Sequence, residues 1–172
     1  MKTKRMIANS ILIAIGAILH QITPALGFPM QPDFALAMLF IIMIFNKEYK
    51  TITICGLIIG IFTAVTTKMP GGQLPNIIDK FVTCNIMYLI LLPLRDKINI
   101  NIQMLILLIL GTFISGTTFL VSLMLIVGLP TGISFTALFI AVVLPTVILN
   151  GIAGYVIYKI VKRTVSTTNV YV

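Results

Sequence analysis

Apolar residues follow one another in long runs along this chain, and short polar stretches separate the runs. A helix that crosses the ~30 Å hydrocarbon core of a membrane needs roughly 20 apolar residues. Counting interfacial ends, the pattern predicts a helix over each of these runs: 6–23, 30–46, 51–67, 75–94, 101–128 and 134–161. The second and third are short, whereas the fifth is long enough to tilt or to extend outside the membrane.

The composition agrees with this pattern. Of the 172 residues, 59% are hydrophobic and 9% are charged, which leaves too little polar surface to cover a soluble globule. We expect an all-α integral membrane protein in the lipid bilayer, with a single six-span domain over 1–163 and a cytoplasmic tail over 164–172. The net charge of +8 is spread thinly between the runs, so nucleic-acid binding is not expected.

Basic residues alternate between the two sides of the predicted bundle. Ten lie at the chain ends or in the second and fourth connections: Lys2, Lys4, Arg5, Lys47, Lys50, Arg95, Lys97, Lys159, Lys162 and Arg163. Only Lys68 and Lys80 fall on the other side. Because cytoplasmic loops carry the excess of Lys and Arg, the alternation predicts six spans in the cell membrane with both termini cytoplasmic.

The most polar of the outward stretches reads MPGGQLPNIIDK, residues 69–80. Its last two residues, Asp79 and Lys80, lie in line with long apolar runs. An ionisable residue at membrane depth is costly and is therefore a functional candidate. The alternative is that Asp79 only stabilises the start of a helix and that Lys80 only reaches the membrane interface.

Two further ionisable residues lie in the outward half. Asp33 begins the second run, where it either caps a helix or binds a substrate ammonium group. His20 is the lone histidine, near the outer end of the first run, with a structural role as the alternative to substrate binding. Prolines and glycines in the outward connections predict ordered turns, which favour a lid over a site that opens outward.

Small residues form one flank of the first run, including Ser10 and Ala14 four positions apart. Such a flank either packs inside the protein or docks onto another membrane subunit.

Motifs of enzymes are absent from the sequence. There is no glycine-rich phosphate loop, no HExxH and no serine elbow, so the chain is expected neither to be an enzyme nor to hydrolyse ATP. Cys55 and Cys84 lie in apolar runs without metal-ligand spacing, and His20 has no second ligand beside it, so neither a metal site nor a cofactor is expected. Energy for transport would come from an ion gradient or a partner.

Several motifs together resemble the TrpP family of tryptophan transport proteins from Gram-positive bacteria. They are the block G-Q-x-P-N-x-x-D-K at 72–80, IGAILH at 15–20, QPD at 31–33, and VGLPTG with LFIAVVLP within 127–145. The sequence departs from the family pattern at Phe81, where a proline is expected. The resemblance implies tryptophan uptake and assigns no binding residues.

The predicted layout is also similar to the substrate-capture subunits of energy-coupling-factor (ECF) transporters. The shared features are six spans, cytoplasmic ends, ordered outer loops and a small-residue first helix. This similarity implies a subunit that binds a nutrient outside the cell and docks onto a shared transmembrane and ATPase module.

We therefore predict a membrane importer of a small nutrient, with L-tryptophan or a similar aromatic amino acid as substrate. Asp79 or Asp33 would bind the substrate ammonium group. Lys80, Asn76 and the N-terminal amides of the fourth helix would bind the carboxylate.

The indole ring requires an apolar slot and an acceptor for its N–H. Gln31 and Gln73 would accept that hydrogen bond, and the candidates for stacking on the ring are Phe28, Phe81, Phe119 and Phe135. The alternatives are the capture subunit of an ECF-type transporter for a vitamin-like aromatic, and a membrane scaffold that transports nothing. The possible partners are an ECF-type module or a second copy of the chain.

Overall fold

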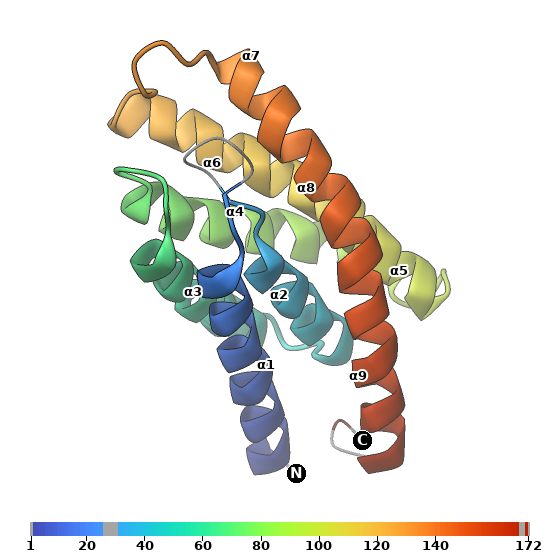
Figure 1. Ribbon diagram of the computed structural model, residues 1–172. Helices are drawn as coiled ribbons and strands as arrows, with labels where there is room; N and C mark the ends of the chain where they lie inside the picture. Colours follow the sequence, from blue (N-terminus) through green and yellow to red (C-terminus); the bar gives the residue numbers. More distant parts are fainter. Residues whose placement is uncertain (1, 26–30, 169–170, 172) are drawn as a thin grey trace.

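The computed structural model describes residues 2–25, 31–168 and 171, and within these ranges the chain forms helices and turns but no strand (Figure 1). The first four helices are α1 (Lys2–Ile22), α2 (Phe34–Phe45), α3 (Tyr49–Thr66) and α4 (Gln73–Leu91), the last continued by the 3-10 turn η1 (Leu92–Leu94). One long helix then consists of α5 (Ile100–Ile106), η2 (Leu107–Gly111) and α6 (Thr112–Ile126). The last long helix consists of α7 (Phe135–Leu138), η3 (Phe139–Val143), α8 (Leu144–Leu149), η4 (Asn150–Gly154) and α9 (Tyr155–Thr168).

Five helical stretches are long and apolar enough to cross a membrane: Thr3–Ile22, Tyr49–Thr66, Gln73–Leu94, Ile100–Ile126 and Phe135–Thr168. They confirm the prediction of an all-α membrane protein. The last stretch continues to Thr168, so its helix includes part of the segment predicted as a tail.

The second predicted span is shorter than expected. The sequence pattern placed it over 30–46, but α2 begins at Phe34, because the side chain of Asp33 caps the helix at that point, and it ends at Phe45. Its 12 residues rise about 18 Å, which is less than the ~30 Å of a hydrocarbon core.

The central element of the bundle is α2. Its sequence, FALAMLFIIMIF, has no polar side chain on any face, and a helix of that kind belongs in a core. Ten consecutive residues, Ala35 to Ile44, are buried, and the helix packs against α1, α3, α5 and η4. In Figure 1, α2 lies in the interior, while α1 begins and α9 ends at the same end of the molecule.

Polar side chains bind the C-terminal end of α2. The guanidinium Nη2 of Arg95 donates to the carbonyl oxygens of Met43 and Asn46, at 2.9 Å each. The Asn46 amide donates in turn to Asn9 Oδ1 of α1, at 3.2 Å. The last carbonyls of a helix have no partner within the helix, so these donors satisfy groups that would otherwise be buried unpaired.

The two longest helices contain π-helical turns, which often accompany functional sites. One of them, η3, directly precedes Pro145 and approaches α6 closely at Gly116. A Cβ atom on Gly116 would lie 2.6 Å from Val143 Cγ1, a separation that real Cβ atoms do not adopt. The absence of a side chain at this residue therefore sets the distance between α6 and η3.

We expect Gly116→Ala to destabilise the protein and Gly151→Ala to do so much less. At Gly151 the nearest atom to an added Cβ is Ile109 Cγ1 at 3.9 Å, so that variant keeps the packing and gains helix propensity. Overpacking at Gly116 should cost ~1–3 kcal/mol. Thermal unfolding of both purified variants in detergent measures the difference, and equal melting temperatures would contradict the packing argument.

Candidate functional site

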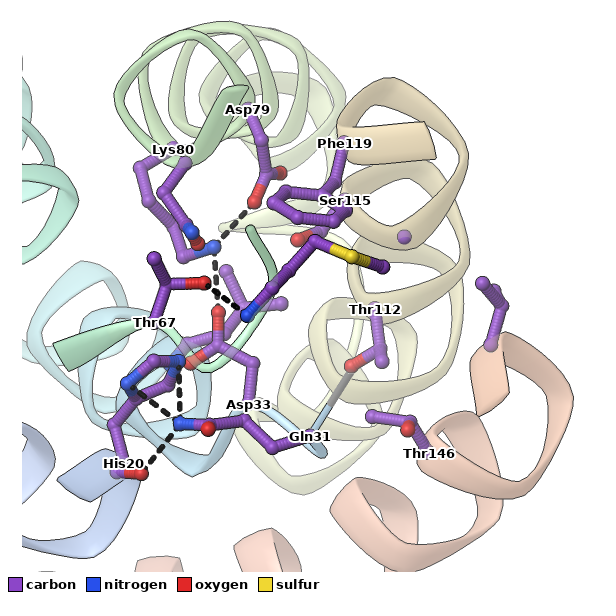
Figure 2. Close-up of a pocket in the computed structure, with 15 residues that line it drawn as sticks. His20, Gln31, Asp33, Thr67, Asp79, Lys80, Thr112, Ser115, Phe119 and Thr146 are labelled. Atoms are coloured by element: carbon purple, nitrogen blue, oxygen red, sulfur yellow. Dashed lines mark hydrogen bonds and ion pairs between the residues drawn. The ribbon is translucent and has the colours of Figure 1, made fainter. Parts of the chain in front are cut away.

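A cavity of about 40 Å³ lies among these helices (Figure 2). The N-terminal end of α2, the second turn of α4, α6 and the η3–α8 segment surround it. Its lining residues are His20, Gln31, Asp33, Leu36, Thr67, Met69, Asn76, Asp79, Lys80, Thr112, Ser115, Gly116, Phe119, Val143 and Thr146.

At the centre of the site, Lys80 forms ion pairs with two carboxylates. Its Nζ lies 2.5 Å from Asp33 Oδ2 and also pairs with Asp79 Oδ2. The Lys80 side chain is only 1% exposed, so its ammonium group lies inside the protein and not on its surface. A lysine this deeply buried needs opposite charges around it, and the two acids supply them.

The two carboxylates differ in their other contacts. Asp33 caps α2, as one reading of the sequence predicted, since its Oδ1 accepts from the backbone N–H of Leu36 at 3.2 Å, and its Oδ2 pairs with Lys80. Asp79 lies beyond the first turn of α4, which begins at Gln73, so it does not stabilise the start of that helix. Its Oδ1 accepts from the hydroxyl of Thr83 at 3.0 Å.

His20 and Gln31 form a hydrogen-bonded pair beside the charges. His20 Nδ1 lies 2.7 Å from Thr66 Oγ1, and the Thr66 hydroxyl donates to the carbonyl of Phe62, so the histidine is the donor to Thr66. Gln31 Nε2 donates to the His20 carbonyl at 2.6 Å and lies 3.2 Å from Nε2 of the ring. Gln31 Oε1 is buried and has no hydrogen-bond partner among the described residues.

The opposite half of the cavity is mainly apolar. Phe119 of α6, Val143 of η3 and Met69 of the α3–α4 loop belong to one buried hydrophobic cluster. Hydroxyl groups of Thr112, Ser115 and Thr146 lie on this side of the charged centre in Figure 2. Sequence analysis missed these three residues, because a small hydroxyl residue in an apolar helix resembles an ordinary packing residue.

Other residues proposed from the sequence occupy varied places. Asn76 lines the cavity, and its amide donates to the Gly72 carbonyl at 2.8 Å. Gln73, the first residue of α4, is exposed and does not line the cavity. Neither does Phe81, which is 45% exposed.

Of the remaining phenylalanines, Phe119 lines the cavity, whereas Phe135 stacks on Phe139 outside it. Phe28 lies outside the described residues. On the far side of α1, Ser10 and Ala14 are exposed and line an open groove together with Thr3, Met6, Ile7 and Ile11.

Comparison with known proteins gives one consistent family. The family described as "Tryptophan transporter TrpP" matches residues 2–166. A probable tryptophan transport protein of Clostridium acetobutylicum is 51% identical over 164 residues, which is 95% of each chain. One of Clostridium perfringens is 51% identical over 94% of this chain and 93% of the relative.

A third relative, a probable tryptophan transport protein of Bacillus subtilis, is 42% identical over 94% of this chain and 92% of its own. No solved structure matches the chain.

We expect Lys80→Met to destabilise the protein strongly. The substitution keeps the length of the side chain but leaves the buried Asp79 and the partly buried Asp33 without a cation, a loss worth ~3–5 kcal/mol when one partner of a buried pair is removed. The triple variant Asp33→Asn/Asp79→Asn/Lys80→Met removes all three charges and should recover much of the loss. Thermal unfolding compares the two variants, and a triple variant no more stable than Lys80→Met would contradict this electrostatic account.

Proposed function

Because the chain belongs to the TrpP family of tryptophan transporters, we propose that it imports L-tryptophan through the cavity around Lys80. The family is one of transporters and not of enzymes, and the chain is a multi-pass membrane protein. The observation that carries the proposal is a buried lysine between two carboxylates, next to an apolar pocket of suitable composition for an aromatic ring.

The charged centre matches the charges of a free amino acid. The Lys80 ammonium group, with Asn76 beside it, binds the substrate carboxylate. Asp33 or Asp79 binds the substrate ammonium group, and the unpartnered Oε1 of Gln31 supplies a further acceptor for it. An uncharged aromatic compound offers no ammonium group to the carboxylates or to Gln31 Oε1, so the site favours an amino acid over an aromatic hydrocarbon.

The apolar half receives the indole ring against Phe119 and Val143. A volume of about 40 Å³ holds little more than water-sized groups, so the ring enters only when neighbouring side chains move apart. Met69 is the candidate for this movement. It is buried in the cavity wall but belongs to the short loop between α3 and α4, which turns at Gly71 with a φ of 73°.

The proposed orientation has the cavity facing outward and both chain ends in the cytoplasm. Its support is the charge bias, since ten of the twelve basic residues lie at the chain ends or in the connections assigned to the cytoplasm. In this arrangement α2 makes the sixth crossing, and the architecture is like that of an ECF substrate-capture subunit.

The test is uptake of radiolabelled tryptophan into cells that express the chain in a host without its own tryptophan carriers or ECF modules. We expect uptake by the wild type and a loss of at least ~10-fold in Asp79→Ala, because the variant leaves Lys80 with one carboxylate fewer and removes an ammonium partner. Asp96→Ala is the control, since Asp96 is exposed in a turn and does not line the cavity.

An uncoupler added in parallel identifies the energy source. Uptake that collapses with the uncoupler indicates a self-sufficient importer driven by an ion gradient. Unchanged uptake in Asp79→Ala would overturn the assigned site. A wild type that shows neither uptake nor binding of tryptophan would favour the scaffold alternative.

The second candidate function is a capture subunit that docks onto an ECF-type module. The observation in its favour is the exposed groove on α1 at Ser10 and Ala14, where the helix presents small side chains to its surroundings. In this case the chain alone binds tryptophan but does not accumulate it.

A bulky substitution separates the two candidates. In a host that supplies an ECF-type module, Ala14→Phe fills the groove and should abolish uptake by a docked subunit while leaving tryptophan binding intact. Ile18→Phe, at an exposed residue outside the groove, is the matched control. Full uptake by Ala14→Phe would exclude docking through this groove.

A further inference from the structure

One buried hydroxyl group in the cavity has no assigned role. Thr146 is 7% exposed, and its Oγ1 has no hydrogen-bond partner among the described residues. Helical threonines usually donate to the carbonyl oxygen three or four residues earlier, as Thr53, Thr66 and Thr117 do here at 3.0, 2.7 and 2.7 Å. A buried polar atom without a partner is costly, so its presence in a binding cavity points to a ligand group.

The position of Thr146 defines which part of a ligand it meets. It follows Val143 by three residues, so the two share a face of the helix, and Val143 belongs to the apolar cluster with Phe119. One turn further along, the Asn150 amide donates to the backbone carbonyl of Asp33 and to Thr112 Oγ1, at 3.1 Å each. Along this helix, Thr146 therefore lies between Val143 of the apolar cluster and Asn150, which is bonded to the backbone of Asp33.

Gln31 has a different location, although its Oε1 also has no partner within the described ranges. Its amide is bonded to His20, on the same side of the cavity as Asp33 and Lys80, whereas Thr146 lies on the other side in Figure 2. A free acceptor among the charges suits an ammonium group, and a free acceptor beside the apolar cluster suits the single donor of an aromatic ring.

We propose that Thr146 Oγ1 accepts a hydrogen bond from the indole N–H and thereby selects indole side chains over aromatic rings without a donor. This inference rests on the proposed import of tryptophan through this cavity. A ring without a donor leaves Thr146 buried and unpaired, which is the condition under which a site discriminates most strongly between ligands of the same shape.

The experiment compares L-tryptophan with β-(3-benzothienyl)-L-alanine, in which sulfur replaces the indole N–H with little change in shape. Affinities are measured by competition against radiolabelled tryptophan, with the purified full-length protein in nanodiscs. The wild type should prefer tryptophan by ~10-fold or more, the effect of one buried donor–acceptor pair. Thr146→Val, which replaces the hydroxyl with a methyl group, should reduce that preference to within ~2-fold by weakening tryptophan binding alone.

Two further variants exclude a purely structural effect. Thr146→Ser keeps the hydroxyl and should keep the preference, while Thr117→Val removes a hydroxyl that bonds its own helix and should leave the preference unchanged. Retained binding of the benzothienyl compound by Thr146→Val shows that the variant is folded.

Other results would overturn the proposal. One is that the wild type shows no preference between the two compounds. The other is that the Thr146→Val variant loses affinity equally for both. A wild type that binds both compounds equally tightly leaves the proposed function intact and removes only this inference. A wild type that binds neither removes the proposed function itself.

Discussion

The ion pairs of Lys80 with Asp33 and Asp79 connect the start of the central helix α2 to the second turn of α4. The N-terminal end of α2 carries unpaired N–H groups and the positive end of the helix dipole, so a lysine beside it would be unfavourable by itself. Asp33 resolves this conflict because one of its oxygens caps the helix and the other pairs with Lys80. Arg95 binds the carbonyl oxygens at the opposite end, where a cation is favourable.

Placing these charges inside a membrane protein costs free energy. Replacement of a buried ion pair by apolar side chains of similar size is often neutral or stabilising, so stability alone does not require three buried charges. The cluster also has two carboxyl groups for one ammonium group, so it has fewer hydrogen-bond donors than acceptors. The unpartnered oxygen of Gln31 adds to the same deficit of donors. A ligand that brings an ammonium group compensates both, which explains why the charges suit an amino-acid substrate better than they suit packing.

The sequence predicts the helices well because a run of apolar residues has few alternatives in a membrane. It also identifies Asp79 and Lys80, since charges within apolar runs are conspicuous. The early start expected for the second span is wrong because hydrophobicity does not reveal that Asp33 caps α2. Thr146 escapes notice for a related reason. Its hydroxyl becomes unusual only when the tertiary structure shows what it fails to bond.

The short length of α2 also shortens the path across the protein. His20 of α1 meets Gln31 just before α2 begins, and Asn9 of α1 meets Asn46 just after it ends, so α2 lies beside the part of α1 between His20 and Asn9. The charged cavity lies at the His20 end. In the proposed function, a substrate bound at Lys80 is separated from the opposite end of α2 by about 18 Å, not by the ~30 Å of a full hydrocarbon core. Since all faces of α2 are apolar and buried, α2 itself offers the substrate no polar side chain, and the proposed import would require the helices around α2 to separate from it.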